Sequence, residues 1–126
     1  MARKTVAILG ASNDRRKYGN KAVRAYLAEG YTVYPINLHE SVIEGLGVSR
    51  SVLDVPEALD RVSVYLPPDK GLAVIDEIAR KGTRELFLNP GAESEALIAR
   101  AEALGLQPIL ACSILEVGRS PEEFQS

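Results

Sequence analysis

The sequence has 126 residues, of which 46% are hydrophobic and 25% are charged, as expected for one globular domain that buries a core of its own. Its 15 basic and 17 acidic side chains leave a net charge of −2, which offers no general attraction to nucleic acid or to an anionic membrane. A single cysteine excludes an internal disulfide, and no apolar run approaches the roughly 20 residues of a membrane span. Because a strand pattern follows Lys4 directly, no signal peptide is expected, and we predict one cytoplasmic domain over residues 1–126.

The opening strand, TVAIL at residues 5–9, is an apolar, partly β-branched run that is closed by Gly10. It lacks the alternation of a half-exposed strand, so it predicts a central strand of a parallel sheet. The polar loop GASNDRRKYG follows and ends at Gly19, and a helical pattern then runs from about Asn20 to Glu29. A strand, a glycine-containing turn and a helix in this order bring backbone N–H groups and a helix N-terminus beneath a phosphate.

The other strands are shorter apolar runs between turn signals. We expect them at residues 31–36, 61–66, 85–88 and 107–111, with a short additional strand around residues 47–49. Pro35 lies within the first of these runs, and because proline donates no hydrogen bond, that strand is expected to stop near Tyr34.

Further helices follow from capping signals and from the spacing of apolar residues. Residues 54–57 (DVPE) predict a short helix that ends near Leu59. A longer helix is expected to run from its N-cap Asp69 to Gly82, and another covers residues 97–104.

Glycine ends a helix one or two residues before a strand three times, at Gly30, Gly82 and Gly105. This alternation of helices and strands predicts right-handed crossovers between parallel strands. The fold class is therefore α/β, a doubly wound parallel sheet of five to six strands with helices on both faces, in a single domain. The tail over residues 118–126 is expected to be loosely held.

A candidate ligand site follows from this topology, because open parallel sheets bind ligands outside the carboxyl ends of their strands. The loops that end there are residues 10–19, 37–39, 67–69, 89–91 and 112–113. We expect these five loops to meet around one ligand.

The first of these loops carries the strongest signal. Gly10 permits a tight turn off the strand, and Gly19 permits close approach at the helix start. Ser12 and Asn13 offer hydroxyl and amide groups between them. The spacing of the two glycines is not GxGxxG, which favours a ligand pose other than the usual dinucleotide one; the alternative is a flexible turn with solvated charges.

The same loop carries a run of cations, Arg15, Arg16 and Lys17, and Lys21 and Arg24 follow one and two helical turns later. A local positive patch beside a phosphate-binding turn implies a ligand with several phosphates. The alternative is an ordinary solvated run of surface charges.

The loop after the second strand contains Asn37 and His39. Dinucleotide-binding proteins usually carry Asp or Glu there to hold a ribose hydroxyl, so Asn37 weakens an NAD interpretation. His39 either contacts a ligand or is a solvated loop histidine.

Two further turns border the expected site. Pro67 and Pro68 end a strand rigidly and form an apolar ledge, or they simply stop the strand and start a helix. Asn89, Pro90 and Gly91 form a turn that is expected to begin the next helix, with N–H groups free to face a ligand.

Covalent and metal chemistry find little support in the sequence. Cys112 follows an apolar strand with no evident base beside it, so it is interpreted as a core residue or a lid over the ligand. The chain has one histidine and no CxxC motif. We therefore predict no catalytic residue and no metal site.

Five segments together resemble a known family. They are the GAS-containing first loop, VYPIN, SVLDVPEALD, VSVYLPPDKGLAVIDEI and FLNPGAESEALIARAEALGL. In order and spacing they resemble the CoA-binding protein family, which is similar to the N-terminal domain of the succinyl-CoA synthetase alpha subunit and of ADP-forming acyl-CoA synthetases. The likeness extends from about Thr5 to Gly118.

The resemblance implies a Rossmann-like domain that holds coenzyme A, or acyl-CoA, through its ADP moiety. The phosphate-loop role falls on Gly10, Ala11, Ser12, Asn13, Lys17, Tyr18 and Gly19. Contacts after later strands fall on Asn37 to His39, on Pro67 and Pro68, and on Asn89, Pro90 and Gly91. The second domain of the synthetases, which carries their phosphorylated histidine, is absent here, and Cys112 and Ser113 stand where many relatives have a Cys-Pro-Lys-like end.

The resulting hypothesis is a stand-alone CoA-binding protein without catalysis, in which Arg15, Arg16 and Lys17 meet the ligand phosphates. One alternative is an NAD(P)-dependent oxidoreductase or redox sensor. Another is a CoA-binding subunit of a partner acyl-CoA ligase. A protein partner or a homo-oligomer stays open.

Overall fold

The computed structural model describes residues 3–125 of the chain. Met1, Ala2 and Ser126, which belong to the expected domain and its tail, lie outside the described residues. A parallel five-stranded sheet has the order β2-β1-β5-β6-β7. Its strands are β1 (Thr5–Leu9), β2 (Thr32–Ile36), β5 (Leu59–Val64), β6 (Thr83–Leu88) and β7 (Pro108–Leu110).

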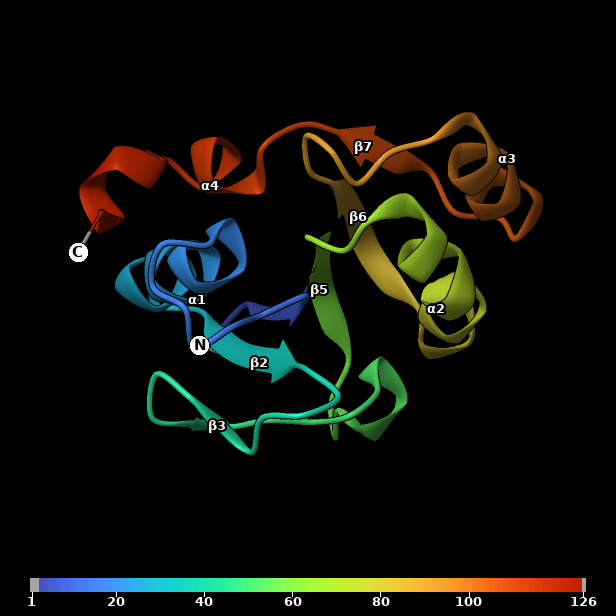
Figure 1. Cartoon of the computed structure of the whole chain (residues 1–126). Coiled ribbons are helices and arrows are strands. Elements are labelled where there is room, and N and C mark those ends of the chain that lie inside the picture. The colour runs from blue at the N-terminus through green and yellow to red at the C-terminus, as the bar shows by residue number, and fades with distance from the viewer. Residues whose placement is uncertain (1–2, 126) are drawn as a thin grey trace.

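Helices cover both faces of this sheet (Figure 1). They are α1 (Tyr18–Ala28), α2 (Pro68–Lys81), α3 (Glu95–Ala103) and α4 (Ser113–Glu116). One face packs against α2 and α3 and the other against α1 and α4. The predicted fold class, an α/β sheet doubly wound by helices, is confirmed. Among residues 3–125, no helix has the length and apolar character needed to cross a membrane.

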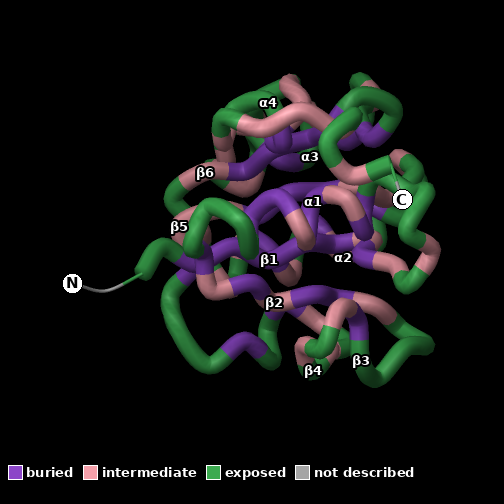
Figure 2. Tube along the Cα trace, turned by 90° about the vertical axis from the view of Figure 1, so that its left-hand side faces the viewer, coloured by how far each residue is buried: buried purple, intermediate pink, exposed green. Residues whose placement is uncertain are grey.

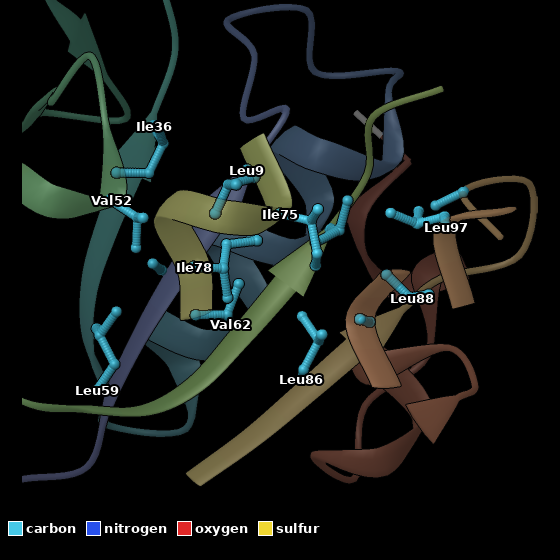
Figure 3. Close-up of a cluster of buried hydrophobic side chains, with 14 of the residues drawn as sticks. Leu9, Ile36, Val52, Leu59, Val62, Ile75, Ile78, Leu86, Leu88 and Leu97 are labelled. Atoms are coloured by element: carbon cyan, nitrogen blue, oxygen red, sulfur yellow. The ribbon is translucent and has the colours of Figure 1, made fainter. Parts of the chain in front are cut away.

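Strand β1 is buried along its whole length, as its apolar sequence predicts. Ala7 and Leu9 point into the α2 and α3 side of the core, whereas Val6 and Ile8 point into the α1 side. Successive residues of a strand face opposite sides of the sheet, so a strand covered on both faces is apolar at every position. Figure 2 shows this buried centre, and Figure 3 shows the α2 and α3 side of the core.

Strand β2 runs through Pro35 to Ile36, so the expected stop near Tyr34 is wrong. β2 is an edge strand, and a proline is tolerated where its nitrogen faces away from the sheet. The Pro35 carbonyl points to the same outer side, where it accepts a 3.1 Å hydrogen bond from the Ser49 N–H. The short strand expected around residues 47–49 is found in part, as β4 (Leu46–Gly47) and the bridge from Ser49 to Ile36. β4 pairs with an unexpected strand, β3 (Val42–Ile43), in a hairpin.

Two helix starts differ from the prediction. The expected helix from Asp54 to Leu59 is instead a 3₁₀ turn, η1 (Val52–Asp54), because Ser51 caps it and Leu59 already belongs to β5. Asp69 is not the N-cap of α2, since that helix begins at Pro68.

The third difference concerns the helix after β6. Helix α3 begins at Glu95, and the Ser94 side chain accepts a hydrogen bond from the Leu97 N–H as its cap. The turn at residues 89–91 therefore precedes this helix without starting it. Helix α4 was not expected, because four residues are too few to show a helical period.

The described part of the C-terminal tail packs against α1. Its last element is the 3₁₀ turn η2 (Pro121–Phe124). The Arg24 guanidinium donates a 2.7 Å hydrogen bond to the Phe124 carbonyl and lies 5.5 Å from the centre of the Phe124 ring. Arg119 pairs with Glu29 at 2.7 Å. Residues 119–124 thus have partners far away in the sequence, in Glu29 and Arg24.

Candidate functional site

A cleft of about 700 Å³ opens at the carboxyl edge of the sheet, as the topology predicts. It is lined by Gly10, Ala11, Ser12, Lys17, Tyr18, Gly19, Asn37, His39, Tyr65, Leu66, Pro67, Lys70, Pro90, Gly91 and Ala92. Four of the five expected loops contribute to it. The fifth does not, since Cys112 is half-buried and packs against the core on the α1 side.

The two glycines of the first loop are required by the geometry. A Cβ at Gly10 would lie 2.9 Å from the Tyr65 backbone, and Gly10 has a φ of +88°. A Cβ at Gly19 would lie 2.1 Å from the Gly10 carbonyl oxygen. The start of α1 therefore packs directly onto the end of β1, and no larger residue fits between them.

Side-chain amides hold the first loop in shape. The Asn37 amide donates a 2.8 Å hydrogen bond to the Ala11 carbonyl, and the Asn20 amide donates one of 2.8 Å to the Ser12 carbonyl. The Asp14 N–H donates to the Ser12 hydroxyl at 3.0 Å. Asn37 thus lines the cleft and also fastens the loop.

The N-terminus of α1 faces the cleft without a neutralising group of its own. Its N-cap residue is Lys17, whose side chain accepts no hydrogen bond, and no acidic residue lies in its first turn. Helix α3 differs, with Ser94 as a cap and Glu95 in the first turn. The partial positive charge of the α1 terminus is therefore left for a ligand to meet.

The two arginines of the loop lie outside the cleft lining. Arg15 pairs with Glu44 at 2.9 Å. Arg16 pairs with Asp14 at 3.0 Å, and its side chain is 87% exposed. The hydrogen bond from the Arg16 side chain lowers the pKa of Asp14 from 3.8 to about 2. Both guanidinium groups already have carboxylate partners in the loop or beside it.

Lys17, Lys70 and His39 are the basic side chains of the cleft. None of the described residues that line it carries a carboxylate. Lys70 was missed in the sequence analysis. Its signal is its place two residues after the Pro67-Pro68 ledge, which puts it in the first turn of α2. Lys21, from the expected patch, does not line the cleft, and its ammonium nitrogen lies 5.2 Å from the centre of the Tyr18 ring.

A second, more apolar cleft of about 330 Å³ adjoins the first. Its apolar lining comes from the ends of β1 and β2 and from α2, namely Leu9, Ile36, Leu38, Leu66, Ala73 and Val74. It shares Gly10, Asn37, His39, Leu66 and Lys70 with the larger cleft. The two clefts therefore form one site with a polar part and an apolar part.

Asn13, Pro68 and Asn89 complete the predicted residues that do not line the cleft. The Asn13 amide turns outward and donates 2.9 Å hydrogen bonds to Glu40 and to the Val42 carbonyl. Pro68 is the first residue of α2, and of the two prolines of the ledge Pro67 lines the cleft. Asn89 is 2% exposed and supports the turn from inside the protein.

Tyr65 lines the cleft and is hydrogen-bonded to Ser113, which is fully buried. The Tyr65 hydroxyl lies 3.2 Å from the Ser113 hydroxyl, and burial raises the pKa of the Tyr65 phenol. The Ser113 hydroxyl also lies 2.6 Å from the Ser63 hydroxyl, so these three hydroxyl groups form one hydrogen-bonded chain. Within residues 3–125, no three His, Cys, Asp or Glu side chains gather closely enough to hold a metal ion.

Comparison with known proteins assigns this arrangement to a family. A family model described as "CoA binding domain" matches residues 4–118. The chain is 30% identical over 86 residues to the alpha subunit of acetate–CoA ligase (ADP-forming) II from Pyrococcus furiosus. The aligned residues cover 66% of this chain and 18% of that subunit. The chain thus spans less than a fifth of that curated relative.

Solved structures agree in fold. A conserved hypothetical protein from Pyrococcus furiosus has a TM-score of 0.80 and 34% identity, covering 91% of this chain and 99% of that chain. The dinucleotide forming acetyl-coenzyme A synthetase 1 from Ca. Korarchaeum cryptofilum has a TM-score of 0.75 and 31% identity, covering 86% of this chain and 26% of that chain. The family match spans the whole sheet and every loop of the cleft, and the chain belongs to the CoA binding domain family.

Proposed function

We propose that this chain binds CoA or acyl-CoA through the ADP moiety and performs no catalysis itself. The observation that carries the proposal is the charge of the cleft. The chain has a net charge of −2, yet the cleft is lined by Lys17, Lys70 and His39 and, among the described residues, by no carboxylate. A multiply charged anion of the size of CoA is the ligand that such a cleft favours.

The pyrophosphate is expected to lie against residues 10–19, where the uncapped N-terminus of α1 offers N–H groups. Lys17 and Lys70 flank that position and would supply charge-assisted hydrogen bonds to phosphate oxygens. The adjoining apolar cleft suits the adenine ring, because Ile36, Leu66 and Val74 offer it flat apolar contact.

An NAD(P) ligand receives less support. Dinucleotide-binding folds hold the ribose with an acidic residue after the second strand, where this chain has Asn37, whose amide is bonded to the Ala11 carbonyl. No second domain for a hydride acceptor is present in residues 3–125. We therefore keep an oxidoreductase or redox sensor as the alternative that the binding experiment must exclude.

A second candidate function is that of a CoA-binding subunit within a larger ligase. The observation that favours it is the 30% identity to an alpha subunit of an ADP-forming acetate–CoA ligase. Conversely, the Pyrococcus furiosus structure that matches this chain over 99% of its length favours a small separate protein. Affinity purification from the source cells distinguishes the two, because a ligase subunit would bring down a larger polypeptide in fixed ratio.

Calorimetric titration with CoA, acetyl-CoA, dephospho-CoA, NAD and NADP tests the proposal. We expect saturable binding of CoA and acetyl-CoA. Dephospho-CoA lacks the 3′-phosphate and should bind about tenfold to a hundredfold more weakly, the worth of one charge-assisted contact. Saturable binding of NAD with none of CoA would reverse the assignment. Equal binding of CoA and dephospho-CoA would show that the 3′-phosphate makes no charge-assisted contact with the protein.

A further inference from the structure

The hairpin of β3 and β4 presents Glu44 to the first loop in an unusual backbone conformation. Glu44 and Gly45 form the turn, with φ values of +49° and +77°. Within residues 3–125, Glu44 is the one non-glycine residue with a positive φ. Side chains with a Cβ rarely adopt this conformation, and when they do, other contacts usually hold them there.

Those contacts come from the first loop and from α1. The Arg15 guanidinium nitrogen Nη1 donates to both Glu44 oxygens, at 2.9 and 3.0 Å. The Asn20 amide donates to the second of these oxygens at 3.0 Å. The Glu44 side chain is 18% exposed, so these bonds are partly shielded from water and are stronger than an open surface pair.

Asn20 connects Glu44 to a residue that lines the cleft. It is fully buried, and its amide nitrogen also donates to the carbonyl of Ser12, which lines the cleft. Its amide oxygen accepts a 2.8 Å hydrogen bond from Arg24. Every polar atom of this side chain that faces the loop is therefore used, which fixes the position of the Ser12 peptide.

A second contact to the first loop comes from Glu40 and Val42, and it is made by Asn13. The Asn13 amide donates to the Glu40 carboxylate and to the Val42 carbonyl, both at 2.9 Å. Residues 40–44 thus contact the first loop at two of its residues, Asn13 and Arg15. The ligand-binding loop is supported from outside, by residues that do not line the cleft.

We infer that Glu44 is a positioning residue for CoA binding: it does not touch the ligand, and through Arg15 and Asn20 it holds the first loop in the conformation that binds phosphate. This inference rests on the function proposed above. It also assigns Arg15 a structural role, because its charge is paired with Glu44. A loop held in its binding conformation loses less entropy when the ligand binds.

Two accounts of Glu44 predict opposite changes in CoA affinity when its carboxylate is removed. If the carboxylate were only a nearby negative charge, its removal would tighten the binding of an anion and would also free Arg15 to meet the phosphates. If it positions the loop, its removal weakens binding although the site becomes more positive. The sign of the change therefore decides between the two accounts.

The test uses the full chain with CoA as the titrant. Glu44→Gly removes the carboxylate, and because glycine adopts a positive φ without strain, the hairpin turn is kept. We expect CoA to bind about tenfold more weakly to this variant. Glu44→Gln keeps the length and one acceptor oxygen, so it should bind within about threefold of the wild type. Glu102→Gln, an exposed change on α3 far from the cleft, is the control and should bind like the wild type.

Amide hydrogen exchange gives a second readout in the absence of ligand. The amides of residues 12–16 should exchange faster in Glu44→Gly than in the wild type, while those of β6 should not change. Unchanged or tighter CoA binding by Glu44→Gly would overturn the inference, and so would unchanged exchange of the loop. Failure of the wild-type chain to bind CoA would instead overturn the proposed function, so the two failures are distinguishable.

Discussion

The backbone N–H of Ser113 donates a 2.8 Å hydrogen bond to the side-chain oxygen of Asn89, deep inside the protein. The Asn89 amide nitrogen donates 2.8 Å bonds to the Ser63 hydroxyl and to the Val64 carbonyl. One amide thereby joins the ends of β5 and β6 to the start of α4. The neighbouring residues Pro90 and Gly91 line the cleft, so this buried network supports one of its walls.

Asn89→Ala should destabilise the protein by about 2 to 4 kcal/mol, because it leaves the buried Ser113 N–H without its acceptor and removes two further buried hydrogen bonds, to Ser63 and Val64. Urea unfolding measures this loss. Gln107→Ala removes an amide from an exposed position before β7 and is the matched control; it should stay within about 0.5 kcal/mol of the wild type. Equal stability of the two variants would show that the Asn89 network contributes nothing.

Gly19→Ala should prevent the loop from closing onto α1. The added Cβ would lie 2.1 Å from the Gly10 carbonyl oxygen, and a backbone atom cannot move aside as a flexible side chain can. We expect a loss of about 3 kcal/mol in the free energy of unfolding, together with loss of CoA binding. Gly47→Ala is the control, because nothing lies within 4 Å of a Cβ there. If both variants unfold at the same urea concentration, the contact between Gly19 and the Gly10 carbonyl does not exclude a side chain.

The lysines of the cleft and the arginine beside it should differ in their effect on CoA affinity. Lys17→Ala and Lys70→Ala each remove a cation from the cleft lining, and each should weaken binding about tenfold or more. Arg16→Ala removes a cation that is paired with Asp14 outside that lining, and it should change the affinity by less than about threefold. Calorimetry at low salt measures all three. If Arg16→Ala weakened CoA binding more than Lys17→Ala or Lys70→Ala, Arg16 would have to contact the phosphates.

The pairing of Asp14 with Arg16 should appear as a pH dependence. The folded-state pKa of Asp14 is lowered from 3.8 to about 2, so the pair contributes to stability above pH 3.8 and this contribution is lost as the pH falls through about 2. Because the pair is exposed to solvent, the contribution is small, and the pKa is the better observable. A carbon NMR titration of the Asp14 carboxyl should give a midpoint near 2, and Arg16→Gln should move it back toward 3.8. A midpoint that does not respond to Arg16→Gln would contradict the pairing.

The sheet and its order of helices could be predicted because long apolar runs carry a clear period. Residues 6–9 are apolar at each position, and such a strand is buried on both faces. The first strand of the hairpin, β3, was missed because a two-residue strand has no period to detect. Helix α4 was missed for the same reason.

The position of the cleft could be predicted from the sequence, whereas the partners of its neighbouring side chains could not. The strand ends determine where the loops meet, so the cleft lies where the topology puts it. The partner of Arg15, however, is Glu44, which is 29 residues away and belongs to the undetected hairpin. Sequence spacing shows a run of cations but not which of them are already paired. Asn89 likewise looks like an exposed turn residue, and only the packing of β5 and α4 turns its amide inward.

The most direct test of the central claim is the crystal structure of the protein with CoA bound. We predict the pyrophosphate against residues 10–19 between Lys17 and Lys70, with the adenine ring in the apolar cleft beside Ile36 and Val74. An empty cleft, with CoA bound elsewhere on the protein, would contradict the account.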